Sequence, residues 1–215
     1  MICRVNFHGE SGEADAKVVA QAMSRMPALL ATYKPEDVYN LDETGLYFRA
    51  QPTKTLAQGK VKGRKIQKDR FTLAFAMNST GTNKLKLLVI HKSQRPRCFG
   101  RWSPSDIVYW HANTTAWMRS DIFETWMQKL NNHFKGQDRN ILLIMDIASC
   151  HSLSGVQQKQ LSRFTALPMT NVTIDFLPPN CTSVVQPLDQ GIIILLLSNC
   201  DTSPSYLNGF YRILI

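Results

Sequence analysis

The sequence lacks the cysteine patterns of disulfide-rich and zinc-binding proteins. Its 215 residues contain no Cys-x-x-Cys pair, and the cysteines are odd in number and irregularly spaced. This spacing argues against a disulfide framework and against a zinc ribbon. We interpret the cysteines as reduced thiols, as is usual in cytosolic and nuclear proteins. They are Cys3, Cys98, Cys150, Cys181 and Cys200.

Long apolar runs are also lacking. The longest aliphatic run, Ile192–Leu197, has six residues, whereas a helix that crosses a bilayer needs roughly 20. Residues Met1–His8 contain no apolar stretch with a small-residue cleavage site, so we expect no secretory signal. Hydrophobic residues still make up 44% of the chain, which suits one folded core and excludes a disordered tail.

Negative charge is scarce in one part of the chain. Overall, 25 Lys+Arg face 16 Asp+Glu, but residues 51–101 hold a single acid, Asp69, and a net charge of +12. Such a cluster predicts a polyanionic partner, because clustered cations release the counterions of a phosphate backbone. A solvated face that only aids solubility is the alternative. The residues expected to bind the partner are Lys60, Lys62, Arg64, Lys65, Lys68 and Arg70.

The apolar periodicity predicts an α/β layer fold with a mixed sheet. Within the first strand region, Asp42-Glu-Thr-Gly45 is a candidate break. The expected elements are a helix at 12–33, a strand and turn at Val38–Phe48, a hairpin of Phe71–Met77 and Lys86–Ile90, an amphipathic helix at Thr114–Phe134, a buried strand at Ile141–Met145, a helix at Leu153–Phe164, a strand at Val172–Phe176 and a helix at Leu188–Leu197.

Three aspartates stand in or beside these elements. Asp146 follows the apolar run Ile141–Met145, at the carboxyl end of a buried strand, where α/β sheets bind ligands. Asp42 lies in the first strand region, and Asp189 opens the last helix. Each has an ordinary alternative: a strand-to-loop turn or an N-cap for Asp146, an Asx-turn before Gly45 for Asp42, and a helix cap for Asp189.

Taken together, the three carboxylates predict a site for hard divalent cations. Mg²⁺ prefers oxygen ligands and keeps several waters, which leaves room for phosphate oxygens. Two such ions about 3.5–4 Å apart can activate an attacking oxygen and stabilise a leaving oxygen in phosphoryl transfer. The basic stretch 51–101 would bring the polyanion to this site.

Three motifs around these aspartates carry a resemblance to a known family. They are Tyr39-Asn-Leu-Asp-Glu-Thr-Gly-Leu-Tyr-Phe-Arg49, Leu142-Leu-Ile-Met-Asp-Ile-Ala-Ser-Cys-His151 and Phe176-Leu-Pro-Pro-Asn-Cys-Thr-Ser-Val-Val-Gln-Pro-Leu-Asp-Gln-Gly-Ile192. The chain resembles the DDE superfamily endonuclease domain of pogo/Tigger-like transposases and of the domesticated jerky and centromere-protein-B relatives. The resemblance covers roughly residues 9–192, and its third motif is long and specific.

The resemblance implies an RNase H-like fold, a mixed central sheet flanked by helices. It also implies DNA strand cleavage and transfer that depend on Mg²⁺ or Mn²⁺, with two ions at the site. The implied catalytic residues and metal ligands are Asp42, Asp146 and Asp189. The residues implied to support the site without ligating metal are His151, Asn180 and Gln186; a packed loop histidine is the alternative for His151.

The sequence departs from the family in several places. Asp146 and Asp189 lie 43 positions apart, which is longer than the spacing usual in the family. The residue after the second aspartate is usually small and polar in the family, but here it is Ile147, which cannot hydrogen-bond the site. After Ile192 the chain continues with aliphatic and then polar residues in place of a basic, aromatic helix. A catalytically inactive, domesticated or truncated remnant that only binds DNA therefore stays open. An RNase H-like ribonuclease ranks last, because no RNA-specific feature is present.

We expect three segments along the chain. Residues 1–34 read as a helical lead-in left from the linker after a missing DNA-binding domain, 35–197 as the catalytic domain, and 198–215 as an atypical tail. Without helix-turn-helix domains, DNA binding should show little sequence preference. We expect a nuclear location and no membrane partner, and a homo-oligomer stays open.

Overall fold

The computed structural model describes residues 16–48, 69–101, 103–148, 169–178, 185–193 and 195. Its helices and strands in chain order are α1 (Ala16–Leu30), β1 (Val38–Leu46), β2 (Phe71–Asn78), β3 (Leu88–His91), β4 (Tyr109–Ala112), α2 (Ser120–Lys135), β5 (Ile141–Met145), β6 (Val172–Phe176) and the π-helical turn η4 (Leu188–Ile192). Among these described residues, no helix has the length and apolarity to cross a membrane.

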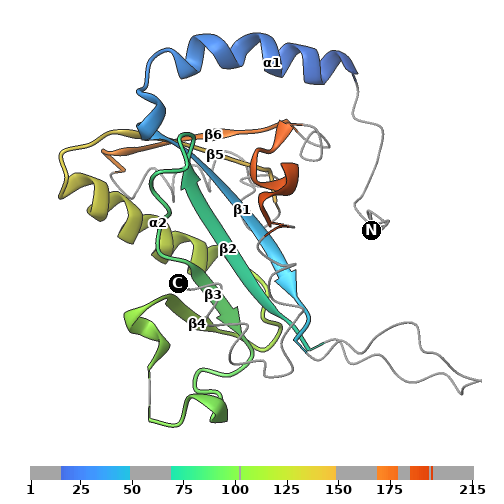
Figure 1. Cartoon of the computed structure of the whole chain (residues 1–215), viewed down its shortest axis with the longest axis vertical. Coiled ribbons are helices and arrows are strands. Elements are labelled where there is room, and N and C mark those ends of the chain that lie inside the picture. Colours follow the sequence, from blue (N-terminus) through green and yellow to red (C-terminus); the bar gives the residue numbers. More distant parts are fainter. Residues whose placement is uncertain are drawn as a thin grey trace, which may run out of the picture.

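Six strands form one mixed sheet in the order β4-β3-β2-β1-β5-β6 (Figure 1). β2 runs antiparallel to both β1 and β3, whereas β5 is parallel to β1, β6 to β5, and β4 to β3. This confirms the expected mixed sheet and the hairpin of β2 and β3. Because β1 and β5 are parallel neighbours, their carboxyl ends face the same edge of the sheet.

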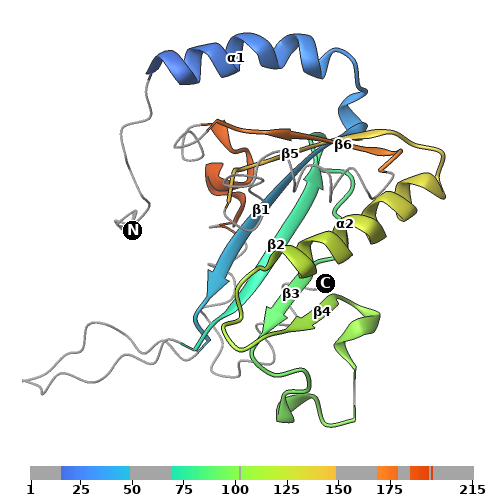
Figure 2. The same cartoon turned by 180° about the vertical axis from the view of Figure 1, so that it is seen from behind.

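The two long helices cover opposite faces of this sheet (Figures 1 and 2). Phe123 of α2 belongs to a buried cluster that includes Leu143 of β5. Met26 of α1 packs on a different cluster, which includes Leu142 and Ile144 of β5. Successive strand residues point to opposite faces, so β5 is covered on both sides. Its five residues are all buried, as its apolar sequence predicts.

The amphipathic helix α2 begins later than the sequence suggested. Periodicity predicted a helix from Thr114, but α2 starts at Ser120. The Asn113 side chain accepts from the N–H of Thr115 (3.1 Å) and donates to the carbonyl of Trp117 (2.7 Å). These bonds stabilise a loop in competition with helix, and Ala116 adopts a positive φ of 56°. The predicted start was therefore wrong, and Trp117 lies outside the helix.

Other predictions also differ from the structure. The expected break at 42–45 is wrong, because β1 pairs with β2 without interruption from Tyr39 to Leu46. β4 was not predicted: it is a four-residue edge strand whose side chains are all half-buried, so it lacks the alternation that marks a strand. The predicted helix 153–164 lies outside the described residues.

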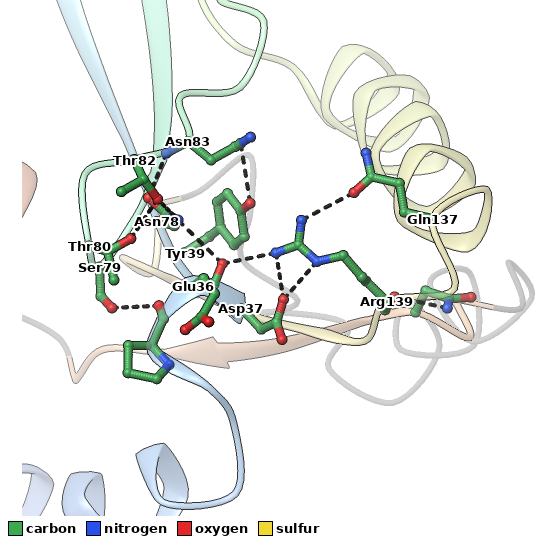
Figure 3. Close-up of polar contacts among 12 residues, drawn as sticks. Glu36, Asp37, Tyr39, Asn78, Ser79, Thr80, Thr82, Asn83, Gln137 and Arg139 are labelled. Carbon is green, nitrogen blue, oxygen red and sulfur yellow. Dashed lines mark hydrogen bonds and ion pairs between the residues drawn. The ribbon is translucent and has the colours of Figure 1, made fainter.

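A polar network fastens the amino-terminal ends of β1 and β5 (Figure 3). Arg139, just before β5, donates from Nε to Asp37 (2.8 Å) and from Nη2 to the carbonyl oxygen of Glu36 (3.0 Å). The hydroxyl of Tyr39 donates to Asn83 (3.2 Å), which ties in the turn between β2 and β3. Asp146 directly follows the opposite end of β5, and Asp42 lies in the interior of β1.

Candidate metal centre

Asp42 lies in the interior of β1 and is only 6% exposed. Its Oδ1 accepts a hydrogen bond from the backbone N–H of Glu43 (2.7 Å). Its Oδ2 is buried and has no hydrogen-bond partner among the described residues. An unpartnered buried carboxylate oxygen is costly, which favours a cation or a proton beside it. The Asx-turn alternative is wrong, because Gly45 lies within the continuous strand.

Parallel pairing aligns Asp42 with Asp146. The last paired residues of β1 and β5 are Asn40 and Ile144. Two positions further along the two segments stand Asp42 and Asp146. Asp146 directly follows the end of β5 and is half-buried. The pairing of the two strands therefore carries both carboxylates to the same level of the sheet.

The turn η4 brings the third aspartate to β1. Gln186, just before the turn, is fully buried and donates from Nε2 to the carbonyl oxygen of Leu41 (3.0 Å). In both views the red segment that contains η4 lies beside β1 (Figures 1 and 2). Asp189 itself is exposed. Pro187 occupies the capping position of this described turn, which has no side-chain cap, so the helix-cap alternative for Asp189 is wrong.

The three aspartates interact electrostatically through Asp42. The pKa of Asp42 is raised from its ordinary value of 3.8 to about 8. Burial is the largest cause, followed by the charge of Asp189 and a side-chain interaction with it, and the charge of Asp146 adds a smaller increase. The hydrogen bond from Glu43 acts in the opposite direction. Carboxyl groups from three separate elements therefore lie within electrostatic reach of one another.

The donor set suits a hard divalent cation, although the side chains are not gathered around one point. Within the described ranges, no group of three His, Cys, Asp or Glu side chains has the spacing of a ligand set. Three carboxylates, one with an unpartnered buried oxygen, are the oxygen ligands that Mg²⁺ and Mn²⁺ accept. The three carboxylates therefore fit such an ion by their donor chemistry.

Arg70 is the one predicted DNA-binding residue within the described ranges. Its guanidinium lies 3.6 Å from the ring centre of Trp117 and donates to Thr72 Oγ1 (2.9 Å). Gly45 lies against it, since a Cβ there would approach Arg70 Cζ to 2.8 Å. Arg70 is thus a fixed cation near the carboxyl end of β1. The predicted residues that lie outside the described ranges are Lys60, Lys62, Arg64, Lys65, Lys68, His151 and Asn180.

Sequence reasoning missed one buried polar residue beside this centre. Asn40, two positions before Asp42, is 7% exposed. The sequence offered one signal for it. Residues two positions apart on a strand share a face, so Asn40 lies on the same face as Asp42. Ile147, which follows Asp146, is 43% exposed and offers the centre no hydrogen bond.

Comparisons with known proteins point in one direction. The profile of the DDE superfamily endonuclease family matches residues 68–200. The chain is 38% identical over 173 residues to Tigger transposable element-derived protein 4 of Mus musculus. The aligned region covers 78% of this chain and 31% of that protein. It is 32% identical over 219 residues to the Jerky protein homolog of Homo sapiens, covering 97% and 37% of the two chains. The chain thus spans about a third of the length of these relatives.

Solved structures share the fold at low sequence identity. A Mos1 transposase paired-end complex with the left transposon end matches with a TM-score of 0.52 and 12% identity, over 98% of this chain and 57% of that chain. A Mos1 mariner paired-end complex with Mn gives a TM-score of 0.50 and 11% identity, over 91% and 52%. At such identity the likeness speaks for the fold alone, and it confirms the expected RNase H-like fold.

Proposed function

Because this chain belongs to the DDE superfamily endonuclease family, we propose that it binds DNA and cleaves and transfers DNA strands with the help of divalent cations. The family membership makes it a transposase-derived domain.

The proposed ligands are Asp42, Asp146 and Asp189. The observation that carries this choice is the unpartnered buried Oδ2 of Asp42, on a strand whose pairing with β5 aligns Asp42 with Asp146. The raised pKa of Asp42 supports it, because the charges of Asp189 and Asp146 are among its causes. Carboxylates that repel one another across separate elements are held together at a cost, which a bound cation offsets. Perturbed groups of this kind cluster at functional sites.

In the proposed reaction these side chains act by holding charge in place. Asp42 would lose its proton when a cation binds, since its burial and its neighbours favour the protonated form otherwise. Asp189, being exposed, would face the DNA side of the centre. When bound, two divalent cations would supply activation of the attacking oxygen and neutralisation of charge on the scissile phosphate.

DNA would approach through the basic stretch 51–101. Support comes from its described part, where Arg95, Arg97 and Arg101 are exposed in the connection between β3 and β4. Such side chains contact phosphates and carry little sequence information. The proposal therefore includes DNA binding without strong sequence preference and a nuclear location, which imaging of a tagged chain would test.

Nicking of supercoiled plasmid in Mg²⁺ or Mn²⁺ tests the proposed reaction. The native chain should nick plasmid only when metal is present, and Asp146→Asn should abolish nicking. Asp121→Asn is the matched control, because Asp121 is an exposed acid at the start of α2, with a side chain 64% exposed. Nicking that survives in Asp146→Asn or proceeds in EDTA would contradict the proposal.

A second candidate is a remnant that binds DNA without cleaving it. Ile147 favours this function, because it places an exposed apolar side chain directly after Asp146, where a polar neighbour would orient the carboxylate. A folded chain that binds DNA with a steep salt dependence but never nicks it would establish this alternative.

A further inference from the structure

The buried amide of Asn40 joins the three segments on which the acidic residues lie. Its Nδ2 donates to the carbonyl oxygen of Ile144 (3.0 Å), and its Oδ1 accepts from the backbone N–H of Leu188 (3.0 Å). Asn40 is two positions before Asp42, Ile144 is two before Asp146, and Leu188 is one before Asp189. One side chain thus links β1, β5 and η4 within two residues of each aspartate.

The Asn40 amide connects the segments at the point where backbone pairing between β1 and β5 ends. The pairing of β1 with β5 ends at Asn40 and Ile144, and η4 is not a strand that could join the sheet. The position of Asp189 is therefore not set by a ladder of backbone hydrogen bonds. A side chain that both donates and accepts can make the connection, and among similar-sized residues an amide has both functions.

Gln186 supplies a second link between the same elements. Its Nε2 donates to the carbonyl oxygen of Leu41, the residue before Asp42, and the side chain is 0% exposed. Leu188, whose N–H bonds to Asn40, follows two positions later and is 2% exposed. Two buried amides thus hold one short turn against β1. Both ends of the Asn40 amide are satisfied, whereas Oε1 of Gln186 has no hydrogen-bond partner among the described residues. Asn40 is therefore the stronger of the two links, because a satisfied buried polar group fixes a unique arrangement.

We propose that Asn40, together with Gln186, is a positioning residue that holds the η4 segment, and with it Asp189, against Asp42 and Asp146. The proposal rests on the proposed metal-dependent function for its purpose. The link that Asn40 makes between β1, β5 and η4, here called the latch, can be measured without any reaction. Asn40→Leu removes both hydrogen bonds and leaves the N–H of Leu188 and the carbonyl of Ile144 buried without this partner.

Hydrogen exchange measures the latch directly. In peptides that cover 185–193, Asn40→Leu should accelerate exchange about tenfold or more, while peptides from β2 should keep their protection. Asn131→Leu is the matched control: Asn131 is an equally buried amide, 6% exposed, whose Oδ1 accepts from the N–H of Asn171 (3.0 Å). Asn131→Leu should leave exchange at 185–193 unchanged.

Mn²⁺ binding, followed by electron paramagnetic resonance, measures the consequence for the centre. Asn40→Leu should weaken Mn²⁺ binding about tenfold or more, whereas Asn131→Leu should not. If Asn40→Leu does not fold, Gln186→Met is used instead, since it removes the bond to Leu41 with little change in volume. Unchanged exchange at 185–193 and unchanged Mn²⁺ affinity in a folded variant would overturn the proposal.

The two readouts separate this inference from the proposed function. If the native chain binds no Mn²⁺, the proposed function fails, and exchange alone decides whether Asn40 holds η4. If the native chain binds Mn²⁺ and Asn40→Leu binds it equally well, the latch is wrong as a positioning device and the proposed function stands.

Discussion

Replacing Asp42 by asparagine should stabilise the metal-free protein at neutral pH and remove a pH dependence of its stability. Burial and the neighbouring Asp189 raise the pKa of Asp42 from 3.8 to about 8, so the folded chain keeps a proton there at pH values at which the unfolded chain has released it. The stability that this proton contributes is fully present below pH 3.8 and is lost as the pH rises toward 8. Asparagine resembles the protonated carboxyl in shape and carries no such proton.

The expected magnitude follows from one proton. Between about pH 5 and 7 the free energy of unfolding should fall by about 1.4 kcal/mol per pH unit on account of Asp42. Over the interval from 3.8 to 7 this amounts to at most about 4 kcal/mol, which Asp42→Asn should largely recover at pH 7. Asp189→Asn should recover part of it, because the charge of Asp189 is the second-largest cause of the raised pKa.

Urea unfolding in EDTA at pH 5.5, 6.5 and 7.5 measures this slope in the native chain and in Asp42→Asn. His111 works in the opposite direction, because burial and the charge of Lys129 lower its pKa below 6.5, so its contribution to stability rises with pH. Both chains contain His111, and the difference between them isolates Asp42. Equal slopes in the two chains would refute the reasoning that Asp42 is protonated in the folded, metal-free protein.

The remaining predictions concern stability and DNA binding. Arg139→Ala should lower the free energy of unfolding by about 2–3 kcal/mol, because it removes two bonds to Asp37 and one to the carbonyl of Glu36 from a side chain that is only 30% exposed. Arg25→Ala should cost less, about 1 kcal/mol or below, because among the described residues Arg25 makes a single hydrogen bond, to Asp175, from a side chain that is 55% exposed. Phe123→Ala should cost about 3–5 kcal/mol, because it removes a side chain that is 0% exposed. Urea titration measures the free energy of unfolding of all three variants. A larger loss in Arg25→Ala than in Arg139→Ala would contradict this reasoning. Lys62→Ala should weaken binding to unrelated duplexes alike and reduce the slope of log K against log salt by about one; an unchanged slope would remove this lysine from the DNA contacts.

Local patterns predicted most of the elements around the centre. The run Ile141–Met145 was predicted correctly because a short, wholly apolar segment is typical of a strand covered on both faces, and β5 is covered in this way. The start of α2 was misjudged because the hydrogen bonds of Asn113 keep the preceding residues in a loop. Apolar periodicity does not register such side-chain bonds. β4 was missed because an edge strand with half-buried side chains carries no alternating pattern.

The sequence by itself determined the class of fold, the family and three acidic positions, because these depend on patterns within single segments. Tertiary structure alone decided how the acids relate to one another. The parallel pairing of β1 with β5 places Asp42 and Asp146 at the same height in the sheet. The buried amides of Asn40 and Gln186 hold η4 against β1. The raised pKa of Asp42 arises from that assembly, because burial and repulsion depend on groups that are distant in the chain and close in space.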